Sequence, residues 1–157
     1  MKKSSVSCQI RRAAIAARFS LMTLAGTAAP AIAGSIEPYA NTGDSWYQFS
    51  MNDQGTWATD PRSKEDSSST YIQVLRKDMP SCRVYVDAKT WYGWVNETVY
   101  GYATVKQTGK WRIRQNVYEN HGRVDARLSA WANNGGGTLS GYWSPDSWGS
   151  YTAINGD

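Results

Sequence analysis

Apolar and polar side chains alternate along most of the chain between residues 45 and 143. In segment 82–89, Cys82, Val84, Val86 and Ala88 take every second position, which is typical of a strand that buries one face. Turn-forming residues separate the alternating segments, and no apolar helical period persists for the length that a helix needs. The pattern predicts about seven strands, at 46–51, 70–77, 82–89, 99–106, 110–118, 123–132 and 138–143.

Short strands separated by turns at near-regular spacing are typical of all-β proteins. One alternating apolar face per strand suits two sheets packed face to face, so we expect an antiparallel β-sandwich, with a closed barrel as the second choice. Residues 34–157 are expected to form this single domain. Segment 60–69 is charged and Ser-rich with nothing apolar to bury, so we expect an exposed, mobile loop there. The tail from Ser144 onward is expected to pack over one end of the sandwich without forming a strand.

The first 33 residues have the pattern of an export signal. A basic stretch ending at Arg18 precedes a short apolar run, and the small residues at 31–33 fit a signal-peptidase site. The run is too short and too interrupted for a membrane span. We therefore expect cleavage after Ala33 and a bacterial protein that is secreted to the extracellular space.

Charge separates these first residues from the rest of the chain. The 17 Lys and Arg against 13 Asp and Glu give a pI near 9.1, but five of the basic residues lie before residue 34, where no acidic residue occurs. The remaining 12 basic and 13 acidic side chains leave the domain almost neutral. We therefore expect no nucleic-acid partner.

Residues that could support catalysis or hold a metal are few. His121 is the one histidine, and its position beside Gly122 fits an ordinary turn. Cys82 is the only cysteine after residue 33, so it has no partner for a disulfide within the domain, and its place in an alternating segment indicates a buried thiol. No nucleophile elbow, zinc-ligand set, phosphate loop or distinctive carboxylate pair occurs. We predict no catalytic residues, no metal, no cofactor and no enzymatic activity.

Aromatic residues are the distinctive feature of the domain, which holds all eight Trp and all ten Tyr. Trp131 shares the polar face of its strand with Arg127, so it should be partly exposed. Exposed flat rings on a rigid β scaffold can stack on sugar rings or anchor a protein partner. The alternative is that these rings serve only as core, since Trp is highly but seldom completely buried. The candidate binding residues are Trp91, Tyr92, Trp94, Arg127, Trp131 and Tyr142.

A ladder of charged residues is a second candidate feature. One predicted strand carries Arg112 and Arg114, and the next carries Asp125 and Arg127. Side by side, these side chains would form either a solvated structural face or a cationic patch for an anionic ligand. The presence of Asp125 favours the solvated face.

The chain resembles small exported proteins of unknown function from Gram-positive bacteria in three features. These are the apparent export signal, about 120 following residues of short strands, and the segment Gly-Tyr-Trp-Ser-Pro-Asp-Ser at 141–147. The resemblance implies secretion and an all-β fold, and it carries no catalytic residues.

These observations favour a secreted, monomeric, non-catalytic binding protein that uses exposed aromatics to contact a glycan, a cell-wall polymer or a protein. The alternative is a secreted antagonist, such as a bacteriocin-like toxin or an inhibitor, and a small hydrolase ranks below both.

Overall fold

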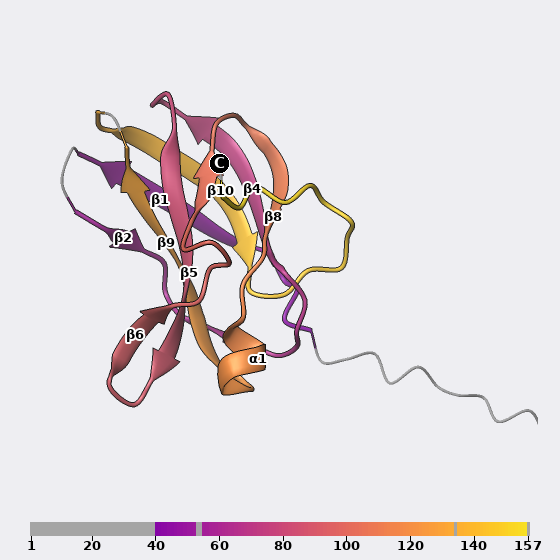
Figure 1. The fold of residues 1–157 in the computed structure, drawn as a ribbon. Helices are drawn as coiled ribbons and strands as arrows, with labels where there is room; N and C mark the ends of the chain where they lie inside the picture. Colours follow the sequence, from indigo (N-terminus) through magenta and orange to yellow (C-terminus); the bar gives the residue numbers. More distant parts are fainter. Residues whose placement is uncertain (1–39, 53–54, 134, 157) are drawn as a thin grey trace, which may run out of the picture. The chain divides into compact units, whose positions relative to one another are not determined.

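The computed structural model describes residues 40–52, 55–133 and 135–156, all of which belong to one compact unit, Ile36–Asp157. The predicted cleavage site and signal segment lie outside the described residues. Two antiparallel sheets pack against each other in this unit (Figure 1). Neither described sheet closes on itself, so the predicted sandwich is confirmed and the barrel is not.

The strands divide between the two sheets in an order that differs from their order along the chain. Sheet A has the order β1 (Ser45–Met51), β10 (Gly137–Ser144), β4 (Thr70–Lys77) and β8 (Gly109–Ile113). Sheet B has the order β2 (Trp57–Ala58), β9 (Val124–Ala132), β5 (Cys82–Thr90) and β6 (Gly93–Asn96), with β3 (Arg62–Lys64) paired to β9 and β7 (Ala103–Val105) paired to β5.

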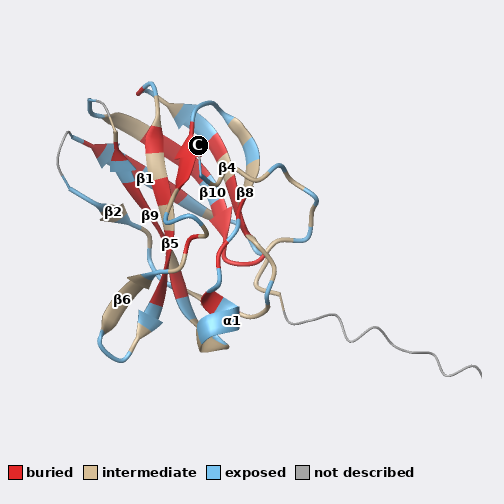
Figure 2. Cartoon of the chain, viewed as in Figure 1, coloured by how far each residue is buried: buried red, intermediate tan, exposed pale blue. Residues whose placement is uncertain are grey.

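The core lies between the sheets and follows the alternation of the sequence. Every second residue from Cys82 to Ala88 on β5 is fully buried, and these residues appear as red bands along the strand in Figure 2. The predicted burial of Cys82 is confirmed, and burial raises the pKa of its thiol to about 12. Trp143 on β10 contributes the largest fully buried side chain.

The predicted strand at 110–118 is wrong in its second half. Strand β8 ends at Ile113, and a short helix, α1 (Val117–His121), follows it. The Gln115 side chain accepts a hydrogen bond from the Val117 amide at 2.7 Å, which starts this turn, while Val117 itself is buried. Gly122 ends the helix with a φ of 69°, a conformation that glycine adopts at little cost.

The predicted strand at 99–106 is also shorter than expected, because only β7 within it is a strand. The Gly101 amide donates to the Thr98 carbonyl at 2.8 Å, and Tyr100 has a φ of 66°. This turn interrupts the extended backbone before Ala103, although the apolar–polar alternation of the sequence continues through it.

Segment 60–69 does not have the fully exposed character predicted for it. Its residues 62–64 form β3, which pairs with β9 so that Lys64 faces Val124. The Lys64 side chain is completely buried although its neighbours in sequence are polar. The expectation failed because the group that compensates this charge, Asp146, lies 82 positions away.

The C-terminal segment runs along the edges of both sheets. Ala153 forms a parallel bridge with Arg112 of β8, and Asn155 forms an antiparallel bridge with Ala103 of β7. The tail therefore joins sheet A to sheet B at one side of the sandwich. Among the described residues, no helix is long and apolar enough to cross a membrane.

Candidate functional site

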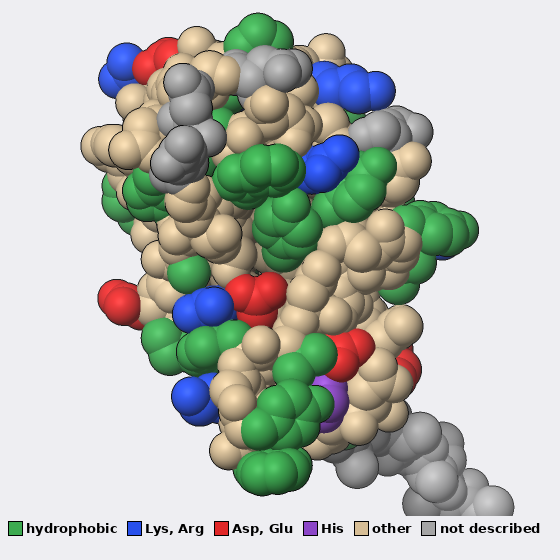
Figure 3. All heavy atoms as spheres, turned by 60° about the vertical axis from the view of Figure 1, so that its left-hand side comes forward, with side chains coloured by type: hydrophobic (Ala, Val, Ile, Leu, Met, Phe, Trp, Pro, Cys, Tyr) green, Lys and Arg blue, Asp and Glu red, His purple; other side chains and the backbone are tan. Residues whose placement is uncertain are grey.

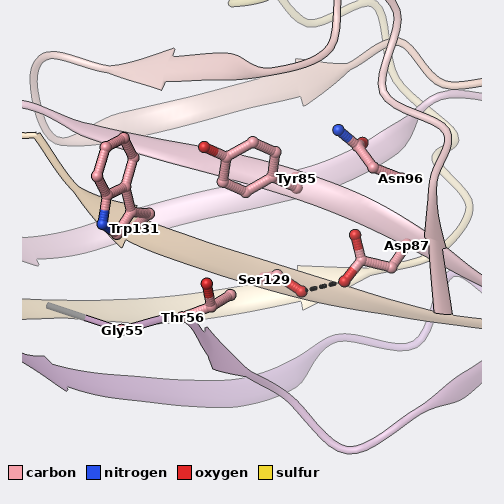
Figure 4. Close-up of a pocket in the computed structure, with 7 residues that line it drawn as sticks. All are labelled: Gly55, Thr56, Tyr85, Asp87, Asn96, Ser129 and Trp131. Atoms are coloured by element: carbon pink, nitrogen blue, oxygen red, sulfur yellow. Dashed lines mark hydrogen bonds between the residues drawn. The ribbon is translucent and has the colours of Figure 1, made fainter.

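A shallow hollow of about 340 Å³ lies on the outer face of sheet B. Four of its lining residues come from the central strands β5 and β9, and the others come from β6 and from the two residues just before β2. Figure 4 shows these side chains from neighbouring strands around a common space. They are Gly55, Thr56, Tyr85, Asp87, Asn96, Ser129 and Trp131.

Strand register brings these side chains together. Strand β5 lies between β9 and β6, and every second side chain of each strand points away from the core. Tyr85 lies opposite Ser129, and Asp87 lies between its two register partners, Arg127 on β9 and Asn96 on β6. Residues distant in sequence therefore form cross-strand rows on one surface.

Asp87 is the centre of a polar network at one end of the hollow. It accepts a hydrogen bond from Arg127 Nε at 3.0 Å and another from the Ser129 hydroxyl, which Figure 4 marks. Its relative exposure is only 8%. A carboxylate this far from water is stabilised by the positive partner and by both hydrogen bonds.

Trp94 extends this network along β6. The Arg127 guanidinium lies 4.3 Å from the centre of the Trp94 ring, and Lys89 Nζ lies 5.0 Å from it. The same arginine is thus held by a carboxylate and by an aromatic face, which fixes its orientation.

Trp131 borders the other end of the hollow and is 37% exposed, which confirms the prediction of partial exposure. The guanidinium carbon of Arg83 lies 5.6 Å from the centre of the Trp131 ring and 4.5 Å from the centre of the Tyr102 ring. The phenol oxygen of Tyr85 points toward Trp131 in Figure 4. Burial raises the pKa of Tyr85, so this hydroxyl stays protonated and can donate a hydrogen bond at neutral pH.

Trp91 and Tyr92 form the tip of the hairpin that joins β5 to β6. Their relative exposures are 95% and 64%, and their rings meet edge to face with centres 5.0 Å apart. Because Thr90 pairs with Gly93, the two rings lie directly beyond the row formed by Lys89 and Trp94. Figure 3 shows hydrophobic side chains interspersed with charged ones on the side that faces left in Figure 1.

Five of the six predicted binding residues thus lie on sheet B or on its β5–β6 hairpin. The sixth, Tyr142, lies on β10 in sheet A, where its ring contacts Trp46 with centres 5.3 Å apart. The structure therefore separates Tyr142 from the hollow.

The predicted charged ladder does not exist, because its two strands belong to different sheets. Arg112 lies on β8 in sheet A, and Arg127 lies on β9 in sheet B, where its carboxylate partner is Asp87. A helix and a change of sheet separate the two strands that the sequence pattern had placed side by side.

Sequence reasoning missed most of the polar lining of the hollow. The period-2 pattern already placed Tyr85, Asp87 and Ser129 on outer faces. The pattern does not indicate which strands lie beside β5. The grouping of these residues depends on those neighbouring strands.

His121 forms a separate polar contact beside α1. Its Nε2 lies 2.7 Å from Glu97 Oε1, and Asn120 donates to the other oxygen of Glu97 at 2.6 Å. Within the described part of the chain, no group of three His, Cys, Asp or Glu side chains could hold a metal ion. The two contacts of Glu97 tie α1 to the loop before β7.

A family model described as "Protein of unknown function (DUF2712)" matches residues 29–147. The searches of curated proteins and of solved structures returned no match. The matched range includes every residue that lines the hollow on sheet B.

Proposed function

Since this chain belongs to a family of unknown function, DUF2712, we propose from its own geometry that it is a secreted, non-catalytic binding protein for a glycan or cell-wall polymer. The observation that carries the proposal is the hollow on sheet B, where the partly exposed indole ring of Trp131 borders a cluster of hydrogen-bonding groups. The signal-like segment 1–33 supports export to the place where such polymers occur.

The chemistry of the hollow suits a sugar ring. The flat face of Trp131 can stack on the apolar face of a pyranose, and the neighbouring side chains can pair with its hydroxyl groups. Both hydrogen bonds of Asp87 end on Oδ2, and a carboxylate offers about four acceptor positions, so Asp87 retains acceptor capacity for a ligand. Asn96 is exposed; its Nδ2 donates to the Gly101 carbonyl at 2.6 Å and its Oδ1 accepts from the Thr98 amide at 2.9 Å, and each atom keeps one further position for a ligand.

Binding of this kind needs no group that exchanges protons with the ligand. Arg127 and Ser129 hold the Asp87 side chain in place, so its remaining acceptor positions can take hydrogen bonds from a ligand. We therefore expect the protein to retain a polysaccharide without releasing soluble sugar from it.

The test is retention of the full chain on purified bacterial cell walls, chitin and cellulose, followed by Trp fluorescence. We expect Trp131→Ala and Trp94→Ala each to weaken binding by tenfold or more. The matched control is Trp46→Ala, because Trp46 is 52% exposed on a strand of sheet A. Circular dichroism verifies the fold of each variant.

Equal losses of binding in Trp131→Ala, Trp94→Ala and Trp46→Ala would show that the hollow is not the binding site. Absence of binding to any wall or polysaccharide by the wild type would overturn the glycan proposal.

One observation favours a second candidate, a secreted antagonist that inhibits a protein target. Trp91 is almost fully exposed at the tip of a two-stranded hairpin, and a protruding aromatic side chain is a common anchor in protein interfaces. Growth inhibition of neighbouring cells that Trp91→Ala abolishes, together with no wall binding by the wild type, would favour this candidate.

A further inference from the structure

A lysine and a carboxyl group face each other inside the sandwich, away from the hollow. Lys64 on β3 donates a hydrogen bond from Nζ to Asp146, which follows β10, and both side chains have 0% exposure. The same nitrogen donates to the Ser68 carbonyl at 2.6 Å. The amine is thus held in one orientation against the carboxyl group, in a place that water does not reach.

The Asp146 carboxyl group is held from its other side as well. Its Oδ2 accepts hydrogen bonds from the backbone amides of Asn41 at 2.7 Å and Glu65 at 3.0 Å. Two amides aimed at one oxygen stabilise negative charge that develops there when a nucleophile adds to the carbon, as in an oxyanion hole. Lys64 lies against the second oxygen of the same group.

A third side chain completes the arrangement. Asp66 Oδ1 lies 3.6 Å from Lys64 Nζ, so the carboxyl groups of Asp66 and Asp146 contact the same amine. Asp66 is therefore placed to exchange protons with both the amine and the carboxyl group.

The charge state of Asp66 suits the role of base. Burial acts to raise its pKa, but hydrogen bonds from Ser68 and the positive charge of Lys64 outweigh burial and hold this pKa below its usual range.

We propose that Lys64 and Asp146 form an intramolecular isopeptide bond, with Asp66 as the proton carrier. The Lys64 amine, deprotonated by the Asp66 carboxylate, adds to Cγ of the protonated Asp146 carboxyl group. Asp66 then gives that proton to the departing hydroxyl and takes the remaining surplus proton from the nitrogen, so the Nζ–Cγ bond forms, one Cγ–O bond breaks, one water leaves and Asp66 ends protonated. No oxidant, reductant or cofactor takes part.

Proximity and exclusion of water favour this step within a folded chain. The buried pair converts a reaction between two solutes into one between fixed neighbours, and the lack of exposure opposes hydrolysis of the product. The bond would join β3 to the end of β10, across 82 positions of the sequence. It would supply a covalent tie in a domain whose one described cysteine, Cys82, is free and buried.

Intact mass spectrometry of the folded full chain tests the proposal. We expect the wild type to be lighter than its sequence by one water molecule. After trypsin, a blocked Lys64 should appear in a branched peptide that joins residues 63–76 to residues 128–157.

Three variants separate the cross-link from a simple ion pair. Lys64→Arg retains the charge and should show the full sequence mass. Asp66→Asn retains both reacting side chains, and it should also show the full mass if it folds. Asp146→Asn should lose ammonia in place of water and reach the same final mass as the cross-linked wild type.

A folded wild type with the full sequence mass and no branched peptide would overturn the proposal. Loss of water that persists in Lys64→Arg would also overturn it, because the loss would then arise elsewhere in the chain.

Discussion

Asp87 and Asp146 each pair with a cationic side chain, but they lie in different surroundings. Asp87 meets Arg127 on the outer face of sheet B, beside a hollow that opens to solvent. Asp146 meets Lys64 where neither side chain has any exposure. The comparison shows that access decides what an ion pair can do: the open pair can exchange partners with a ligand, and the closed pair can act only within the chain.

Breaking the closed pair should have the largest effect. Lys64→Met leaves the Asp146 carboxylate buried without its cation, so we expect the free energy of unfolding to fall by about 3–5 kcal/mol. Urea denaturation followed by Trp fluorescence measures this change.

The double variant Lys64→Met with Asp146→Leu sharpens the comparison. Replacing a simple buried ion pair with apolar side chains is often neutral, whereas loss of a cross-link that closes a loop of this length costs about 4 kcal/mol in chain entropy. We expect the double variant to remain less stable than the wild type. Full recovery would show that the pair is ionic only.

The open pair should respond more weakly to the loss of its charge. Asp87→Asn leaves Arg127 and Ser129 with a neutral partner, so we expect a loss of about 1–3 kcal/mol in urea denaturation. Polysaccharide retention should weaken in the same variant. Asp125→Asn, at an exposed position of the same β9 strand, is the control and should change stability by about 0.5 kcal/mol or less.

The buried face of β5 offers a further test, which uses the pH dependence of stability. The folded pKa of Cys82 is about 12, against an ordinary value of 9.0, so the unfolded chain releases this proton at lower pH than the folded chain does. Stability should therefore fall as pH rises from 9 toward 12, by up to about 1.4 kcal/mol for each pH unit. Cys82→Ala should remove that part of the alkaline loss, and an unchanged slope would contradict the assignment.

The smallest effect is expected on the outer face of sheet A. Tyr142→Ala removes the edge-to-face contact with Trp46, which is worth about 1 kcal/mol. Binding to cell walls should stay within a factor of two of the wild type, because Tyr142 lies on the other sheet from the hollow. A loss of binding as large as that of Trp131→Ala would show that the ligand contacts both sheets.

The sequence predicts local features of this fold well. Alternation along β5 identified the burial of Cys82, and alternation along β9 identified the partial exposure of Trp131, because both depend on which face of one strand a residue occupies. The short helix at Val117 was missed because five residues are too few for a helical period to show.

Features that depend on distant residues could not be predicted in the same way. Lys64 lies in a polar stretch that resembles an exposed loop, and only its contact with Asp146 explains its burial. Likewise, Asp87 and Arg127 are 40 positions apart, and their contact depends on β5 lying beside β9. Pairing of strands is a property of the whole chain, which local alternation does not encode.

The C-terminal segment gives this sandwich protection against self-association. Arg112 of β8 exchanges backbone hydrogen bonds with Thr152 and Ile154, and the Thr104 amide of β7 donates to the Ile154 carbonyl. Unpaired backbone groups at a sheet edge are a template on which a second copy can add its own strand, and fibrils grow from such contacts. By occupying these groups on β8 and β7, the tail covers one edge of each sheet, so its removal should lower the solubility of the protein more than the stability of its fold.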